Sequence, residues 1–303
     1  MRRHMHDTDV IFPDENTVVR HSVLVQIQHW AVALSGIVLL FSGFGQLPVY
    51  KRYMLNQVPG FAWVSDFILQ FNIHMIAAVV FTFAAVFHLI YHFIEGGRSI
   101  WPRKGDVKES VQIISAMIRG KEEPPSHKFL AEQRLAYAFI GFSIVLLILT
   151  GFLKLLDNIA GVTVPYWLTF WGTNLHNIGT VLFLFGFIAH LGAFLIKSNW
   201  PLFVSMFNGR VKLDYAEHRH PLWLREIREG RALEGKMTVE NGVRTVAGFM
   251  VATGLLLGAL VHPLWYLLPA FVSVNLIQSA FTRWCPMENL IRRLWHGETS
   301  GGE

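Results

Sequence analysis

Six long apolar runs, separated by polar segments, dominate the pattern along the chain. They cover residues 22–44, 66–94, 133–154, 168–196, 241–261 and 264–284. Because a spanning helix needs about 20 mostly apolar residues, each run predicts a helix that crosses a membrane. Lipid offers no partner to backbone N–H and C=O groups, so helices rather than open strands are expected. The pattern therefore predicts an all-α integral membrane protein with both termini on one side.

Basic residues between the runs predict the orientation of these helices. Residues 95–132 and 197–240 are rich in Lys and Arg, whereas DNIAGVTVPYW after the third run has none. Loops of up to about 60 residues that are rich in Lys and Arg stay on the cytoplasmic side, so both termini are predicted to be cytoplasmic, in a bacterial-type inner membrane. The polar segment 197–240, with its basic His218–Pro221 stretch, is expected to be a surface linker. It separates a four-helix domain (1–235) from a two-helix transmembrane hairpin module (236–303).

Composition narrows the chemistry that the chain can perform. Hydrophobic residues make up 52% of the chain and charged residues only 16%, against roughly a quarter charged in soluble domains. The single cysteine, Cys285, excludes an internal disulfide and a cysteine-based iron–sulfur site. The polar N-terminus has no apolar region directly behind it, so no cleaved signal is expected. The lipid bilayer is the expected surroundings, and no nucleic-acid partner is expected.

Histidines inside the membrane are the main candidate functional residues. Six of the 14 lie within the first four runs: His29, His74, His88, His92, His176 and His190. A single one would serve equally well to hydrogen-bond a neighbouring helix, but ionisable groups at this depth are rare and usually functional. His74 and His88 are 14 residues apart, as are His176 and His190, which places each pair on one helix face about 21 Å apart. Imidazole is a common axial ligand of haem iron, so the spacing predicts two haem groups at two depths.

Topology restricts how these histidines pair. The second and fourth helices run in the same direction, with His74 and His176 near their outer ends, so these two can face one haem. His190 lies near the cytoplasmic end of the fourth helix. His29 and His88 are both candidates for its partner, and the sequence geometry leaves that choice open.

Further motifs accompany the histidines: QHWAVALSGI in the first helix, AEQRLAYAF entering the third, LH-x13-H in the fourth and RVKLDYAEHRHPLWLREI after it. With these motifs, residues 18–231 resemble the cytochrome b (gamma) subunit of membrane-bound formate dehydrogenases. That group belongs with the di-haem cytochromes of nickel–iron hydrogenases and thiosulfate reductases. The resemblance implies a four-helix di-haem cytochrome b bundle with two haem b groups. His74 and His176 would then hold the periplasmic iron, and His29 and His190 the cytoplasmic one.

The resemblance gives the other two histidines lesser roles. It favours His29 over His88 as the partner of His190, and His88 then packs or hydrogen-bonds a haem edge. His92 would meet the headgroup layer or a propionate. Where relatives often carry an Arg three residues before the first ligand, this chain has Gln26. Arg20 is the alternative partner for a propionate.

The resemblance also implies a quinone site beside the cytoplasmic haem, at the start of the third helix. The matching residues are Leu130, Ala131, Glu132, Gln133 and Arg134. Gln133 is the candidate donor to a quinone carbonyl, with His190 as its expected neighbour. Glu132 is the candidate proton relay, although a helix start favours a carboxylate for electrostatic reasons alone. Leu130 replaces a polar residue of the family, which alters this site.

The implied function is that of a membrane anchor in a respiratory oxidoreductase. Electrons would pass between a periplasmic iron–sulfur subunit and the quinone pool, menaquinone or ubiquinone. A formate dehydrogenase-like catalytic subunit would oxidise the substrate, and the resemblance is compatible with a higher oligomer of the complex. The alternatives are the quinone-side subunit of a hydrogenase or sulfur-compound reductase, and a haem-free sulfur-handling module that uses Cys285.

The C-terminal hairpin has motifs of its own. Residues 236–296 end in Trp-Cys-Pro-Met-Glu after two apolar runs. They resemble a two-helix membrane module that occurs alone or fused to rhodanese sulfurtransferase domains. An interaction or stabilising hairpin is the preferred role, with Cys285 as a reactive thiol the alternative. His262 and Pro263 are predicted to form its outer turn.

Overall fold

The computed structural model describes residues 9–94, 98–159, 161–229, 239–260, 262–282 and 284–289. Two compact units divide the chain. The small unit comprises residues 27–89, and the large unit comprises residues 1–26 and 90–303. The predicted domain boundary at residue 235 lies outside the described residues, so it stays a prediction.

The small unit consists mainly of two long helices, α1 (Val23–Gln46) and α3 (Phe67–Ile94), whose ends extend beyond it. Between them lie α2 (Val49–Arg52) and two 3-10 turns, Leu55–Gln57 and Ala62–Ser65. Helix α3 begins after Asp66, whose carboxylate accepts the Leu69 N–H at 3.0 Å. A side chain at Gly45 would meet Gln70 at 2.5 Å, so α1 and α3 approach closely there.

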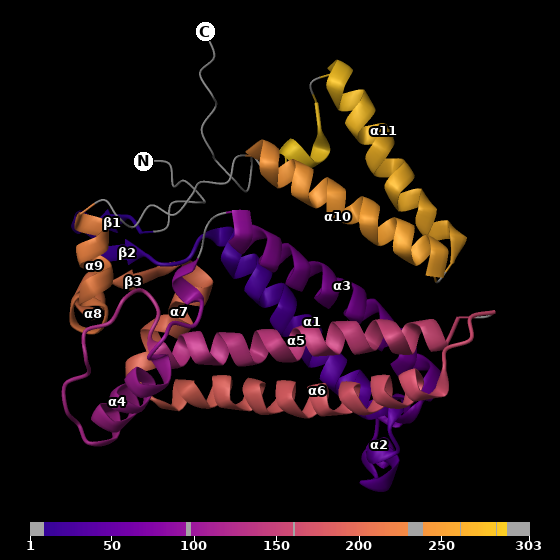
Figure 1. Ribbon diagram of the computed structural model, residues 1–303, viewed down its shortest axis with the longest axis horizontal. Helices are drawn as coiled ribbons and strands as arrows, with labels where there is room; N and C mark the ends of the chain where they lie inside the picture. The colour runs from indigo at the N-terminus through magenta and orange to yellow at the C-terminus, as the bar shows by residue number, and fades with distance from the viewer. Residues whose placement is uncertain are drawn as a thin grey trace. The chain divides into compact units, whose positions relative to one another are not determined.

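In the large unit, α5 (Ala131–Asp157) and α6 (Tyr166–Gly192) form an antiparallel pair (Figure 1). Small residues let their backbones approach. A Cβ on Gly179 would lie 3.2 Å from Leu147, and one on Gly186 would lie 3.1 Å from Ile140. Both helices expose large apolar side chains that a soluble protein would bury, including Phe142, Leu149, Val181 and Phe185.

A small cap of short strands and helices, which was not predicted, also belongs to the large unit. Strands β1 (Ile11–Phe12), β2 (Thr17–Val19) and β3 (Arg210–Lys212) form an antiparallel sheet in the order β1-β2-β3. Val18 pairs with Val211, so the sheet joins segments far apart in sequence. Helices α7 (Trp200–Asn208), α8 (Leu213–Arg219) and α9 (Pro221–Arg228) complete it. Its buried core consists of Val18, Val211, Ala216, Trp223 and Leu224. Short 3-10 turns cover Pro13–Glu15, Arg98–Ile100, Ala193–Leu195 and Lys197–Asn199.

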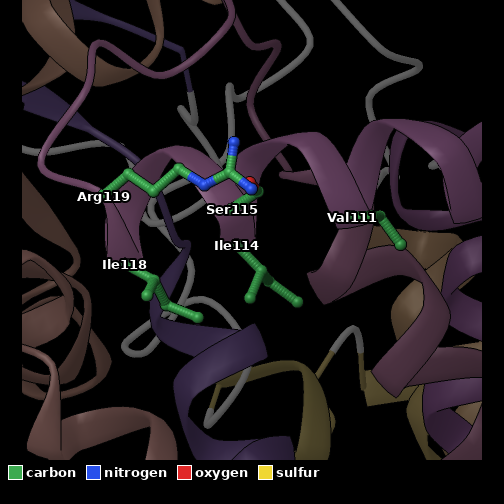
Figure 2. A pocket seen from close by; sticks show the side chains of 5 residues that line it. All are labelled: Val111, Ile114, Ser115, Ile118 and Arg119. Atoms are coloured by element: carbon green, nitrogen blue, oxygen red, sulfur yellow. The ribbon is translucent and has the colours of Figure 1, made fainter.

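Helix α4 (Asp106–Ile118) is fastened to the start of α5. Arg134 donates two hydrogen bonds to Asp106, at 2.6 and 2.9 Å, and both side chains are buried. Ile113 packs with Leu130 and Ala131 beside this ion pair. The outer side of α4 carries a hollow of about 310 Å³ (Figure 2), lined by Val111, Ile114, Ser115, Ile118 and Arg119. None of these lining residues was predicted to be functional.

The C-terminal hairpin consists of α10 (Val239–Leu260) and α11 (Leu267–Thr282), joined through the 3-10 turn Pro263–Tyr266 (Figure 1). His262 accepts the Leu264 N–H through Nδ1 at 3.2 Å, which confirms the predicted turn. Glycines at 254 and 258 allow the close contact with Pro269 and Tyr266. Cys285 is buried, and the Asn275 amide donates to its sulfur at 3.4 Å.

The helices confirm an all-α membrane architecture. Within the described ranges, five are long and apolar enough to cross a membrane: Val23–Gln46, Phe67–His92, Ala131–Asp157, Tyr166–Leu195 and Pro263–Thr282. The fifth predicted run, 241–261, corresponds to α10, whose apolar part is the shorter stretch Val243–Ala259. The span predicted at 241–261 therefore stays a prediction, whereas the one predicted at 264–284 corresponds to Pro263–Thr282.

Candidate functional site

Helix α1 holds the imidazole of His74, which lies on α3. The hydroxyl oxygen of Ser42 lies 2.9 Å from His74 Nδ1, and Ser42 is completely buried. The same hydroxyl donates to the Val38 carbonyl one turn earlier, at 2.7 Å. Gly43 faces the ring edge, where a Cβ would lie 3.6 Å from Cε1. The small unit therefore holds one imidazole through its Nδ1.

Helices α5 and α6 of the large unit repeat this arrangement around His176. Thr150 Oγ1 lies 2.9 Å from His176 Nδ1 and donates to the Leu146 carbonyl at 2.6 Å. Gly151 faces the ring, with a Cβ position 3.6 Å from Cε1. Thr150 is only 3% exposed. Each unit thus contains one predicted ligand in equivalent surroundings.

A third predicted histidine, His88, is also held through Nδ1. The oxygen acceptor is Oε1 of the buried Gln28 on α1, at 3.1 Å. An amide oxygen only accepts, so His88 Nδ1 carries the proton. His88 is therefore as well prepared to bind a metal through Nε2 as His74 is, and the structure does not favour His29 over it.

The other membrane histidines contact aromatic rings edge-on. His29 lies against Trp30, His92 against Tyr137 and His190 against Phe194, with ring centroids 5.3, 6.2 and 5.5 Å apart. His74, His88 and His29 belong to the small unit, whereas His176 and His190 belong to the large one. The predicted pairs of ligands join the two units, so the pairing stays a prediction.

The predicted quinone segment begins helix α5. Gln133 Oε1 accepts the Leu130 N–H at 3.1 Å and a hydrogen bond from Arg20 at 3.5 Å. Its oxygen is thus engaged, which leaves its amide N–H groups for a ligand. Glu132 has a buried oxygen, Oε2, that has no hydrogen-bond partner among the described residues. Arg134 is committed to Asp106, so it acts in fastening α4.

Arg20 is a buried cation beside this segment. It is 2% exposed, and its guanidinium lies 5.2 Å from the Phe129 ring centroid and 5.5 Å from that of Trp223. Burial lowers the pKa of Arg20 to about 10. Its Nε and Nη1 have no hydrogen-bond partner within the described ranges. Gln26, at the position where relatives often carry an Arg, instead donates to the His21 and Ser22 carbonyls.

The prediction of a surface linker at His218–Pro221 was wrong for its central residues. Arg219 and His220 are buried in the cap. His220 Nδ1 donates to the His127 carbonyl at 2.7 Å, and Nε2 has no partner in the described part of the chain. Burial, followed by the charge of Arg20, holds the pKa of His220 well below its usual range. This burial depends on contacts distant in sequence, the hydrogen bond from His220 to the His127 carbonyl and the pairing of β2 with β3, which local polarity does not reveal.

The first 209 residues contain both hydroxyl–imidazole pairs and all six membrane histidines. The family model described as prokaryotic cytochrome b561 matches residues 20–209. The chain belongs to the prokaryotic cytochrome b561 family. This confirms the cytochrome b part of the resemblance, and with it a membrane electron-transfer cytochrome. The match does not single out the formate dehydrogenase subunit.

A second match covers the C-terminal hairpin. Residues 237–297 match the transmembrane domain of YgaP-like inner membrane proteins, so the hairpin is similar to a membrane module distinct from the cytochrome. No curated protein gives a significant match to the chain.

Cytochrome b561 proteins bind haem b, and the donor set of this chain fits that cofactor. Imidazole binds iron through one ring nitrogen while the other N–H is commonly held by an oxygen. Oxygens hold the Nδ1 atoms of His74, His176 and His88 at 2.9, 2.9 and 3.1 Å. The nitrogen that would bind iron in each is therefore Nε2.

Sequence reasoning missed the three residues that supply these oxygens, Ser42, Thr150 and Gln28. A signal for two of them was present. The pattern Ser-x6-Ser-Gly-Phe at residues 35–44 recurs as Ser-x6-Thr-Gly-Phe at residues 143–152. A search for internal repeats would have drawn attention to both hydroxyls.

Proposed function

We propose that this cytochrome b561 protein is the membrane-anchoring, di-haem subunit of a respiratory oxidoreductase of the formate dehydrogenase type. It passes electrons between a periplasmic iron–sulfur subunit and the membrane quinone pool. The observation that carries the proposal is the pair of equivalent imidazoles, His74 and His176, each held through Nδ1 by a buried hydroxyl. Bound haem b supplies a one-electron redox centre.

The proposed ligands are His74 and His176 for the periplasmic haem and His29 and His190 for the cytoplasmic haem. The pairing rests on the family resemblance. His88 is retained as the alternative to His29, because Gln28 holds its Nδ1 in a ligand-like manner. The buried donors of Arg20 suit an anionic group such as a propionate.

The proposed quinone site lies at the first turn of α5. Gln133 offers only its amide N–H groups, because its oxygen already accepts two hydrogen bonds. An N–H donor suits a quinone carbonyl, which accepts. The buried oxygen of Glu132, which has no hydrogen-bond partner in the described part of the chain, would carry a proton when the quinone is reduced. Menaquinone and ubiquinone both fit this chemistry.

The proposed partners and orientation follow from the same hypothesis. An iron–sulfur subunit and a formate dehydrogenase-like catalytic subunit bind on the periplasmic side. Both termini lie in the cytoplasm, because the long basic segments 95–132 and 197–240 disfavour translocation. Electrons that enter outside and reduce quinone with cytoplasmic protons would move charge across the membrane.

The first test is purification of the protein from native membranes with its bound subunits. We expect two haem b per chain and a b-type alpha band in the reduced-minus-oxidised spectrum. Absence of that band would falsify the proposal. A copurified hydrogenase or sulfur-compound reductase, in place of a formate dehydrogenase, would assign the subunit to the alternative complex.

Single variants then test the ligands. His74→Ala and His176→Ala should each reduce the haem content from two to one per chain. Comparison of His29→Ala with His88→Ala identifies the partner of His190, because only substitution of the true ligand should cause loss of a haem. Gln133→Leu should slow reduction by quinol while the haem content stays at two. Equal haem content in all four histidine variants and the wild type contradicts the ligand assignment.

A further inference from the structure

We propose that Ser42 and Thr150 are positioning residues that set the tautomer of His74 and His176 and tune the redox potential of the haem these histidines bind. The inference rests on the proposed function, since it concerns the same ligands. It assigns a role to two hydroxyl groups that the family match does not address.

The direction of each hydrogen bond follows from the third partner. A hydroxyl has a single hydrogen, and a carbonyl has none to donate. The oxygens of Ser42 and Val38 lie 2.7 Å apart, and those of Thr150 and Leu146 lie 2.6 Å apart. Two oxygens at this distance repel unless a hydrogen lies between them, so each hydroxyl donates to its carbonyl. The hydroxyl lone pairs then accept from the imidazole.

Each imidazole is therefore protonated on Nδ1. Two chains of hydrogen bonds result. In one, His74 Nδ1–H donates to Ser42, which donates to the Val38 carbonyl. In the other, His176 Nδ1–H donates to Thr150, which donates to the Leu146 carbonyl. In neutral imidazole the proton on one nitrogen leaves a lone pair on the other. The hydroxyls thus present Nε2 of both rings as the metal-binding atom. Successive hydrogen bonds polarise one another, which pushes electron density towards Nε2.

A Ser or Thr that bonds back to its own helix is common in membrane helices, so one such contact would carry little weight. Here the arrangement occurs in both units. Ser42 and Thr150 are 108 residues apart, as are the glycines and phenylalanines that follow them. His74 and His176 occupy corresponding places on the next helix of each pair. The repeat preserves the hydroxyl, the glycine and the imidazole together.

The same helices provide internal controls. Ser35 and Ser143 lie seven residues before Ser42 and Thr150 and are buried as well. They donate to the Ala31 and Phe139 carbonyls at 2.5 and 2.9 Å. Within the described ranges, the hydrogen-bond partners of Ser35 and Ser143 lie on their own helices, unlike those of Ser42 and Thr150. If a buried hydroxyl mattered only for the helix, all four serine and threonine residues would behave alike.

The experiment compares four variants of the purified holoprotein, Ser42→Ala, Thr150→Val, Ser35→Ala and Ser143→Ala. Haem per chain, optical redox titration and the electron paramagnetic resonance of the ferric haems are measured. Removing the hydrogen bond lessens electron donation to iron, which favours the reduced form. For Ser42→Ala and Thr150→Val we expect a three- to tenfold shift towards the reduced haem, about 30–60 mV upward at 59 mV per tenfold for one electron. The two controls should show no shift.

The conservative exchanges Ser42→Thr and Thr150→Ser keep the hydroxyl and should keep the wild-type potential and resonance. If Ser42→Ala or Thr150→Val loses haem altogether, the conservative exchange decides, because retained haem supports the role and lost haem overturns it. Unchanged potentials in haem-containing Ser42→Ala and Thr150→Val also overturn it. A wild-type protein without haem would instead overturn the proposed function, so the two failures are distinguishable.

Discussion

The buried ion pair between Arg134 and Asp106 gives a prediction whose size can be worked out. Both side chains are 2% exposed, and two hydrogen bonds join them at 2.6 and 2.9 Å. The substitution Asp106→Asn keeps the shape but removes the negative charge. Removing one partner of a buried pair costs about 3–5 kcal/mol, because the other charge stays buried. Glu109, which lies 3.3 Å from the same guanidinium, should hold the cost near the lower limit.

The expected effect is local, because the pair joins α4 to the start of α5. A cost of about 3 kcal/mol raises the equilibrium constant for release of α4 roughly 150-fold, at about tenfold per 1.4 kcal/mol. Backbone amide hydrogen exchange in α4, measured on the detergent-solubilised protein, should accelerate by about that factor. Exchange in α6 should not change. In the wild type, the free energy of releasing α4 should not change between pH 5 and 8.

The pH expectation has a definite sign. The hydrogen bond from Arg134 is the main cause that lowers the pKa of Asp106 below its ordinary value. A carboxyl with a depressed folded pKa stabilises the fold above its unfolded pKa, about 3.9, and loses that contribution as the pH falls through the folded value. Glu109→Gln is the matched control, since its half-exposed pair should contribute at most about 1 kcal/mol. If Asp106→Asn changed α4 exchange by less than threefold, the reasoning would be refuted.

Three further predictions concern the cap and the hairpin. His220 is buried, and its pKa in the folded protein lies below the unfolded value of about 6.5. The free energy of unfolding of the cap should therefore fall by up to about 1.4 kcal/mol per pH unit below 6.5, as measured by hydrogen exchange in α8 and α9. His220→Asn, which keeps a donor for the His127 carbonyl, should remove that slope. Trp223→Phe removes the donor to Asp9 at 2.7 Å and should cost the cap about 1–3 kcal/mol in the same assay. Gly254→Ala collides with Pro269 and should destabilise the hairpin by about 1–3 kcal/mol in thermal unfolding, whereas Gly248→Ala, where a Cβ meets open space, should change it by less than about 0.5 kcal/mol.

The long helices could be predicted from the sequence because lipid imposes a simple rule on them. The first four predicted runs correspond to α1, α3, α5 and α6 within a few residues. The cap could not be predicted in this way. Its strands are two or three residues long, too short for an alternating pattern, and β2 pairs with β3 across nearly 200 residues. The burial of Arg219 and Arg134 could not be predicted, because it depends on such distant contacts.

The residues of the candidate site also fall into those that the sequence could predict and those that it could not. The histidines could be found because an ionisable residue in an apolar run stands out by itself. Ser42, Thr150 and Gln28 could not be found by that criterion, since small polar residues are ordinary in membrane helices. Their role depends on which imidazole faces them, and this is a property of packing between helices. Only the repeat of the Ser/Thr-Gly-Phe pattern carried that information in the sequence.

The repeat also shows where the two helix pairs differ. The positions 108 residues after Gln28 and His29 are Ala136 and Tyr137, so α5 has no counterpart of either. The first helix of each pair, α1 or α5, keeps the hydroxyl that lies against an imidazole. The N-terminal halves of α1 and α5 differ. Under the proposed function, α5, which contains no histidine, supplies no haem ligand. The first turn of α5, which contains Glu132 and Gln133, is therefore available to bind the quinone. The N-terminal halves of α1 and α5 therefore differ because, in the proposed function, the first contributes to haem binding and the second binds the quinone.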